Sequence, residues 1–272
     1  MGNDKDVYFS NGNLQYKASD DIWRFSNNQW GFVGGTDNET NSEYGNVFEG
    51  GIKCDNSLIS YSYDGWIDLF GWATSGYEHG STCYQPWSTS VNNYDYYAYG
   101  QPNYNLNDQN GRADWGYNAI ENGGNREGLW RTLTQQEWNY VFNVRSTFFG
   151  FRFAKSVLND VNGFILLPDD WRMSYFTLNN VNQGNAPYSS NVLSVSQWDI
   201  LEQYGAIFLP ASGLRVHGVS YSGNGELGIY WSSTINYGGD NIPYDITLGD
   251  GALTNSNYSY YGKSVRLVQD AH

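Results

Sequence analysis

Basic residues are scarce in this sequence. Its 272 residues include 14 Lys and Arg against 28 Asp and Glu, which gives a formal net charge of -14 at pH 7. The basic residues are also scattered, with no basic run. Because phosphate binding requires Lys and Arg that displace counterions, this composition argues against nucleic acid as a partner.

Long apolar segments are missing as well. No window of about 18 apolar residues is present, so we expect no membrane span. Met1 to Asp6 lack the charged region and apolar stretch of an export signal, which is compatible with a cytoplasmic protein or with a signal that has been trimmed, and we expect the trimmed signal. Tyr and Trp are abundant, at 24 and 11 residues, whereas charged residues make up only 15%. This composition is typical of extracellular or cell-surface proteins.

Cysteine and histidine are also rare. Cys54 and Cys83 are the only cysteines, and their spacing is compatible with a disulfide or with two separate thiols. The histidines are His79, His217 and His272. They are too few and too dispersed to form a metal cluster, so we expect no metal and no cofactor.

Short strands separated by glycine and asparagine turns are predicted in the N-terminal part. Their residues are 7–9, 14–18 and 22–25. Residues 34–127 are dominated by Asn, Gly, Ser, Asp and Tyr. Because disordered segments contain few aromatic residues, we predict long ordered loops in this region, anchored by Trp66, Phe70 and Trp72.

Two helices are predicted from their capping residues. Thr134 and Glu137 form a capping-box pattern ahead of apolar residues at helical spacing. These residues are Trp138, Val141 and Phe142. A second cap at Ser196 is predicted to start a helix that Gly205 ends. The apolar residues of this helix are Trp198, Ile200, Leu201 and Tyr204.

Each helix precedes an apolar run typical of a buried strand, and further strands follow. These strands are predicted at 163–168, 205–210, 228–234, 243–248 and 264–268. Alternation with period two places Tyr244, Ile246 and Leu248 inward. The same alternation places Asp245 and Thr247 outward.

The order of these elements predicts an α+β fold with a mainly antiparallel sheet. We expect a single domain over residues 1–272, because no linker divides the chain. Residues 1–130 would form an N-terminal elaboration of strands and loops, and residues 131–270 would form the core.

Several motifs together resemble one protein family. They are V-Y-F-S-N-G-N-L-Q-Y at 7–16, G-W-I-D-L-F-G-W at 65–72, W-R-T-L-T-Q-Q-E-W at 130–138, I-L-L-P-D-D-W at 165–171, Y-W-S-S-T at 230–234 and G-K-S-V-R-L-V at 262–268. With them the chain resembles exported proteins of gut Bacteroidales that are similar to the Fibrobacter succinogenes major paralogous domain. The resemblance implies a C-type lectin-like fold, in which two helices flank a small sheet and the two ends of the chain meet. By that analogy residues 264–268 pair with residues 7–9.

The chain also resembles the variable proteins of diversity-generating retroelements. These proteins place ligand-binding residues between a W-S-S-T-like segment and an S-V-R-L-V-like strand, and randomised adenines in AAC and AAT codons cannot produce Lys, Glu, Gln, Trp or Met. None of these five residue types occurs from Ile235 to Tyr261. The resemblance implies a diversified binding face, with a reverse transcriptase and a second copy of codons 230–268 in the flanking DNA. The candidate ligand-binding residues are Asn236, Tyr237, Asp240, Asn241, Asp245, Thr247, Asp250, Asn255, Asn257, Tyr258, Tyr260 and Tyr261.

The composition of residues 235–261 favours recognition over catalysis. Tyr supplies rigid contact area, and Asn and Ser supply adaptable hydrogen bonds, which is the chemistry of antibody paratopes. We therefore expect a non-enzymatic adhesin or receptor-binding protein with a protein or glycan ligand on another cell or host surface. A phage tail tip is the alternative location.

Three alternatives stay open on the sequence alone. The Asn, Ser and Tyr stretch can be an ordinary solvated loop. A carbohydrate-binding surface lectin would instead use Trp66, Trp72, Trp87 and Trp115, although large loops also need aromatic anchors. A polysaccharide-active enzyme would require two carboxylates about 5 to 10 Å apart in a cleft, and Asp169 and Asp170 are more typical of a turn. Gln101-Pro102-Asn103 nearly matches a calcium-lectin tripeptide, which we interpret as coincidence.

Overall fold

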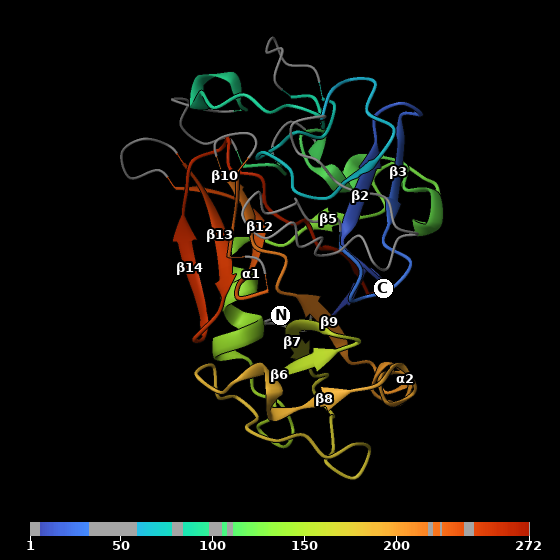
Figure 1. Ribbon diagram of the computed structural model, residues 1–272, viewed down its shortest axis with the longest axis vertical. Coiled ribbons are helices and arrows are strands. Elements are labelled where there is room, and N and C mark those ends of the chain that lie inside the picture. The colour runs from blue at the N-terminus through green and yellow to red at the C-terminus, as the bar shows by residue number, and fades with distance from the viewer. Residues whose placement is uncertain are drawn as a thin grey trace.

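The fold is α+β in a computed structural model. The structure describes residues 6–32, 59–77, 84–97, 105–107, 111–216, 220–223, 225–236 and 242–271. Within these ranges it consists of mainly antiparallel sheets and two short α-helices (Figure 1). None of the helices in the described ranges has the length and apolar character needed to cross a bilayer. The two cysteines, the three histidines and residues 101–103 lie outside the described residues.

One sheet occupies the lower end of the molecule in Figure 1, with strand order β8-β6-β7-β9. Its strands are β6 (Phe153–Leu158), β7 (Val161–Leu166), β8 (Val192–Leu193) and β9 (Ile207–Pro210). The two buried strands predicted after the helices are confirmed as β7 and β9. They pair antiparallel, with Phe164 opposite Leu209.

The first predicted helix is confirmed. It is α1 (Gln135–Asn139), and Thr134 and Glu137 form both hydrogen bonds of a capping box. The chain continues as a π-helical turn, Tyr140–Val144. The residues expected at helical spacing, Trp138, Val141 and Phe142, are buried.

The second helix begins earlier than predicted. It is α2 (Val195–Gln203), and its N-cap is Ser194 rather than Ser196. Gln197 decides this register, because a capping box needs Gln or Glu three residues after the cap. Ser194 satisfies that spacing and exchanges both capping-box hydrogen bonds with Gln197. Gly205 follows the helix with φ of 84°, a left-handed conformation that favours glycine, as expected for the helix end.

A second sheet, β12-β13-β14, lies beside α1 (Figure 1). Its strands are β12 (Gly228–Asn236), β13 (Ile242–Leu248) and β14 (Ala252–Ser256). Tyr230, Ile246 and Leu248 on one face form a hydrophobic cluster with Trp138 and Phe142. Helix α1 therefore covers this face and leaves the opposite face for other contacts.

The two ends of the chain meet in a third sheet, β1-β15-β5. Its strands are β1 (Val7–Phe9), β15 (Leu267–Asp270) and β5 (Arg131–Thr132). Val7 lies opposite Asp270 and Phe9 opposite Val268, so the early strand pairs with the C-terminal strand as expected, although that strand is Leu267–Asp270 and not residues 264–268.

The N-terminal loops attach to β12 through buried tryptophans. The indole of Trp72 donates to Ser232 O at 3.0 Å, and the indole of Trp231 donates to Phe70 O at 2.7 Å. Trp72 and Phe70 are both fully buried, which confirms them as anchors. Trp66 is only half-buried, and the Arg24 guanidinium lies 3.6 Å from its ring centre.

The other elements are short. Strands β2 (Leu14–Lys17), β3 (Ile22–Phe25) and β4 (Trp66–Ile67) form one sheet, and β10 (Leu214–Val216) pairs with β11 (Ser220–Ser222). Single 3-10 turns are η3 (Asn93–Asp95), η5 (Trp115–Tyr117), η6 (Glu121–Gly123) and η8 (Tyr188–Ser190). The β2–β3 hairpin lies on the opposite side of β12 from β14 (Figure 1).

Candidate binding face

Three of the predicted tyrosines pack against one another just after β14. The rings of Tyr258 and Tyr260 are stacked, with centroids 5.2 Å apart and an interplanar angle of 9°. Tyr261 meets both rings edge-on, at 5.7 Å and 5.0 Å. Tyr258 is 46% exposed, whereas Tyr260 and Tyr261 are half-buried. The cluster thus presents ordered aromatic rings to solvent.

A buried ion pair lies beneath the tyrosine cluster. Lys263 Nζ is 2.5 Å from Asp245 Oδ2, and both side chains have no exposed area. The ammonium also lies 3.9 Å from the ring centre of Trp231 and 5.8 Å from that of Tyr261. The prediction that Asp245 faces solvent is wrong. Asp245 does lie on the face opposite Ile246, but Lys263 covers it there.

Asp245 extends this pair into a hydrogen-bond network on the outer sheet face. Asn257 Nδ2 donates to Asp245 Oδ2 at 2.7 Å, and the Thr247 hydroxyl donates to Asp245 Oδ1 at 3.0 Å. Asn255 Nδ2 donates in turn to Thr247 Oγ1 at 3.1 Å. Four predicted residues therefore meet in one network. Asp245 is the buried residue of this network, and Asn255 is its exposed residue.

Neighbouring loops fix the backbone of the tyrosine segment. Ser259 N donates to Asn93 Oδ1 at 2.9 Å, and Trp72 N donates to Ser259 O at 2.8 Å. Gly262 is packed so closely that a Cβ there would lie 2.7 Å from Arg215 Nε. A side chain at this position would displace the segment, so the rings are held at a fixed site.

One exposed side chain that sequence reasoning missed belongs to this face. Leu253 is 64% exposed on β14 and lies opposite Thr247 in the ladder. Side chains of a strand alternate between its two faces, and this alternation could have identified Leu253 from the sequence. Sequence reasoning also missed Asn93, whose side chain accepts a hydrogen bond from Ser259 N. No local pattern links residues so far apart in sequence.

We call Leu253, Asn255, Tyr258 and Tyr260 the tyrosine face. Asp250 does not belong to it, because it lies in the turn before β14 while the tyrosines follow the strand. Asn236 is half-buried at the end of β12. Tyr237, Asp240 and Asn241 lie outside the described residues.

The buried lysine gives this site a testable pH dependence. Burial lowers the pKa of Lys263 to about 8, although Asp245 stabilises the ammonium. The folded chain therefore releases this proton near pH 8, whereas an unfolded chain keeps it up to the ordinary pKa of 10.5. Because the unfolded state binds more protons between these values, this group makes the free energy of unfolding rise with pH across that window.

We expect this contribution to be on the order of 1–2 kcal/mol between pH 7.5 and pH 9.5. Denaturant titrations at the two pH values measure it. The matched control is the double variant Lys263→Met/Asp245→Leu, which lacks the titrating amine. If the wild-type chain gained no more stability than this control, Lys263 would not titrate in that range.

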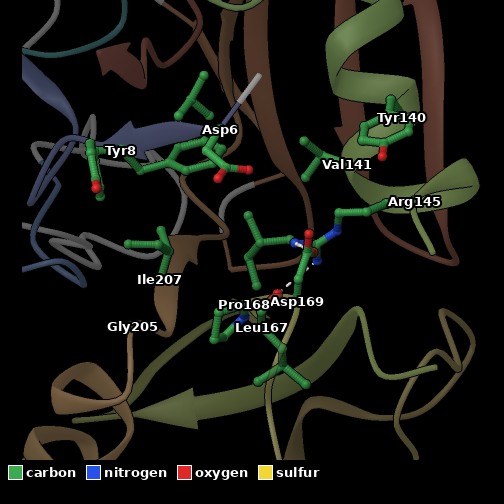
Figure 2. Close-up of a pocket in the computed structure, with 13 residues that line it drawn as sticks. Asp6, Tyr8, Tyr140, Val141, Arg145, Leu167, Pro168, Asp169, Gly205 and Ile207 are labelled. Carbon is green, nitrogen blue, oxygen red and sulfur yellow. Dashed lines mark hydrogen bonds and ion pairs between the residues drawn. The ribbon is translucent and has the colours of Figure 1, made fainter. Parts of the chain in front are cut away.

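A pocket of about 460 Å³ lies elsewhere, between β1, the π-helical turn, β7 and β9. Figure 2 shows Arg145 extending toward Asp169 at its edge. Arg145 Nη1 donates to Asp169 Oδ1 at 2.9 Å, and its Nη2 donates to Leu167 O at 2.7 Å. The predicted turn at Asp169-Asp170 is confirmed by a hydrogen bond from Trp171 N to Pro168 O. The polar groups at the edge of this pocket therefore have a structural role, because they link Arg145 to the segment that contains Leu167 and Asp169.

One buried carboxyl group in the described chain has a raised pKa. Burial raises the pKa of Asp114, which accepts hydrogen bonds from Gly116 N, Thr132 N and the Thr132 hydroxyl. These contacts join η5 to β5, which is a structural role. The described residues contain no group of three His, Cys, Asp or Glu side chains placed to hold a metal ion.

Comparison with known proteins assigns no family to this chain. No protein-family model, no curated protein and no solved structure matches the chain.

Proposed function

We propose that this protein is a non-enzymatic recognition protein that binds a partner on another cell or host surface through the tyrosine face. The observation that carries the proposal is the exposed tyrosine cluster above a fully buried Lys263–Asp245 pair. Rings that are already ordered lose little conformational freedom on binding, which leaves more of the contact free energy for affinity. Tyr and Asn also combine apolar contact with adaptable hydrogen bonding.

The tyrosine face favours a protein surface as the ligand. Its residues line none of the three pockets described for this chain, and a surface outside those pockets suits a partner that buries area by lying across it. Leu253 adds an exposed aliphatic side chain beside the polar Asn255. A mixture of aromatic, aliphatic and amide groups is typical of the centre of a protein interface.

The proposal includes a C-type lectin-like arrangement and display outside the cell. The pairing of β1 with β15 and the two short helices beside small sheets support this arrangement. Diversification by a retroelement is part of the same proposal. It is supported by the position of Asn255, Tyr258 and Tyr260 near solvent, above a scaffold formed by Gly262 and Lys263.

The experiment is a selection of peptide ligands with a random peptide library displayed on phage. Because a few central residues carry most of the binding free energy of an interface, we expect the selected peptides to bind the wild-type chain and to lose binding to Tyr258→Ala. The matched control is Tyr8→Ala, which removes another exposed ring, 66% accessible and on β1. Peptides that bind Tyr258→Ala as well as wild type would overturn the proposal.

A further inference from the structure

A second aromatic site lies beside the β2–β3 hairpin. One pocket of about 500 Å³ and another of about 350 Å³ share Ser75, Gly76 and Asn118 in their walls. Because they share these residues, the two pockets adjoin, and we call the two together the aromatic groove. Each volume lies in the range of pockets that hold small ligands.

Trp87 forms a fixed ring surface in this groove. It is half-buried and lies parallel to Tyr16, with centroids 6.2 Å apart and an interplanar angle of 24°. Tyr16 packs in turn on Trp23 at 4.6 Å, and both are almost fully buried. Tyr61 stands at the rim and is 73% exposed. The groove thus contains one ring that is held by packing, Trp87, and one that is largely exposed, Tyr61.

The four tryptophans considered for sugar binding differ in their surroundings. Trp72 and Trp115 have no exposed area and serve as anchors. Trp66 lies under the Arg24 guanidinium. Among these four, Trp87 alone lines a pocket described here. Its ring is therefore the one placed to stack on a ligand.

Hydrogen-bonding groups accompany these rings. Asn118 Nδ2 donates to Ser75 O at 3.0 Å and to Trp115 O at 3.2 Å, which fixes the amide and leaves Oδ1 without a donor among the described residues. Asp21 Oδ1 accepts the Tyr16 hydroxyl at 2.9 Å, at the other side of the first pocket. A ligand with many hydroxyl groups can both donate to and accept from such a set.

We propose that the aromatic groove binds a neutral oligosaccharide. The apolar C–H face of one sugar ring would stack on Trp87 beside Tyr61, and the next sugar would lie near Tyr77 and Tyr117 in the second pocket. A purely apolar ligand would leave Asn118 Oδ1 unmatched. An anionic ligand would meet Asp21 in the first pocket and Glu127 in the second.

The charge of the second pocket agrees with a neutral ligand. Arg112 and Glu127 both line it, and the Arg112 guanidinium lies 5.7 Å from the ring centre of Tyr117. The two opposite charges leave little net attraction for an anion. This inference is independent of the tyrosine face, because the two sites share none of their named residues.

Affinity electrophoresis in native gels tests the proposal. The gels contain xyloglucan, mixed-linkage β-glucan, galactomannan, glycol chitin or polygalacturonate, the last being an acidic probe. We expect at least one neutral polysaccharide to retard the wild-type chain. Tyr61→Ala should reduce the retardation several-fold, and Trp87→Ala should abolish it. Trp87→Phe, which keeps a ring, should retain part of it.

Two controls separate this site from general effects. Phe148→Ala removes a ring that is 79% exposed outside the groove and should bind as wild type does. Tyr258→Ala should also bind as wild type, so failure of the tyrosine-face proposal would not affect the result. Because Tyr61 is largely exposed, its substitution is expected to leave the fold intact even if Trp87→Ala does not fold. Absence of retardation by every neutral probe, or equal retardation of wild type and Tyr61→Ala, would overturn the proposal.

Discussion

Replacing Asp245 with Leu is expected to lower the free energy of unfolding by about 3–5 kcal/mol, because it leaves the Lys263 ammonium buried without its carboxylate partner. Both side chains have no exposed area, so water cannot replace the lost carboxylate. Asn257 and Thr247 also lose the acceptor of their hydrogen bonds. Denaturant titration followed by tryptophan fluorescence measures the loss.

The double variant Lys263→Met/Asp245→Leu is the matched control. An apolar pair of similar volume often replaces a buried ion pair at little cost, so we expect it to recover most of the lost stability. Asn257 loses its acceptor in this variant, and we therefore expect weaker binding of selected peptides despite the recovered stability. If Asp245→Leu alone were within 1 kcal/mol of wild type, the ion pair would not be needed to support this face.

Removing the two outer rings is expected to weaken ligand binding far more than it weakens the fold. In Tyr258→Ala/Tyr260→Ala, each ring should account for about 2 kcal/mol, or roughly 30-fold in affinity, if both act as central hot spots. Tyr258 is nearly half exposed and stacks mainly on its neighbours, so the melting temperature should change little. Titration calorimetry with a selected peptide measures the affinity.

Phe variants at the same positions separate the ring from the hydroxyl group. Tyr258→Phe/Tyr260→Phe keeps the stacked rings, and we expect it to retain most of the affinity if contact area dominates. A loss in the Phe variant equal to that in the Ala variant would instead assign the binding to hydroxyl hydrogen bonds. Unchanged affinity in the Ala variant would remove these rings from the binding site.

Local sequence patterns determined the secondary structure of the core. The capping box of Thr134 and Glu137 depends on residues three positions apart, so the sequence alone locates it. The apolar runs that form β7 and β9 likewise predict buried strands, whichever segments pack against them. The wrong prediction of Ser196 as the N-cap also has a local cause. Ser194 and Ser196 can both cap this helix, and the position of Gln197 selects Ser194.

Tertiary structure decided which of the predicted site residues meet solvent. Asp245 alternates outward in sequence, but Lys263 returns across the sheet and covers it. Ser259 is held by Asn93, which lies far from it in sequence. The aromatic groove similarly depends on Tyr16, Trp87 and Asn118 meeting from separate segments. Strand alternation and helix capping depend on neighbours within a few residues, so the sequence alone determined the secondary-structure elements. The exposure of a side chain depends on which distant segment packs against it, so only the folded chain determined the two candidate binding surfaces.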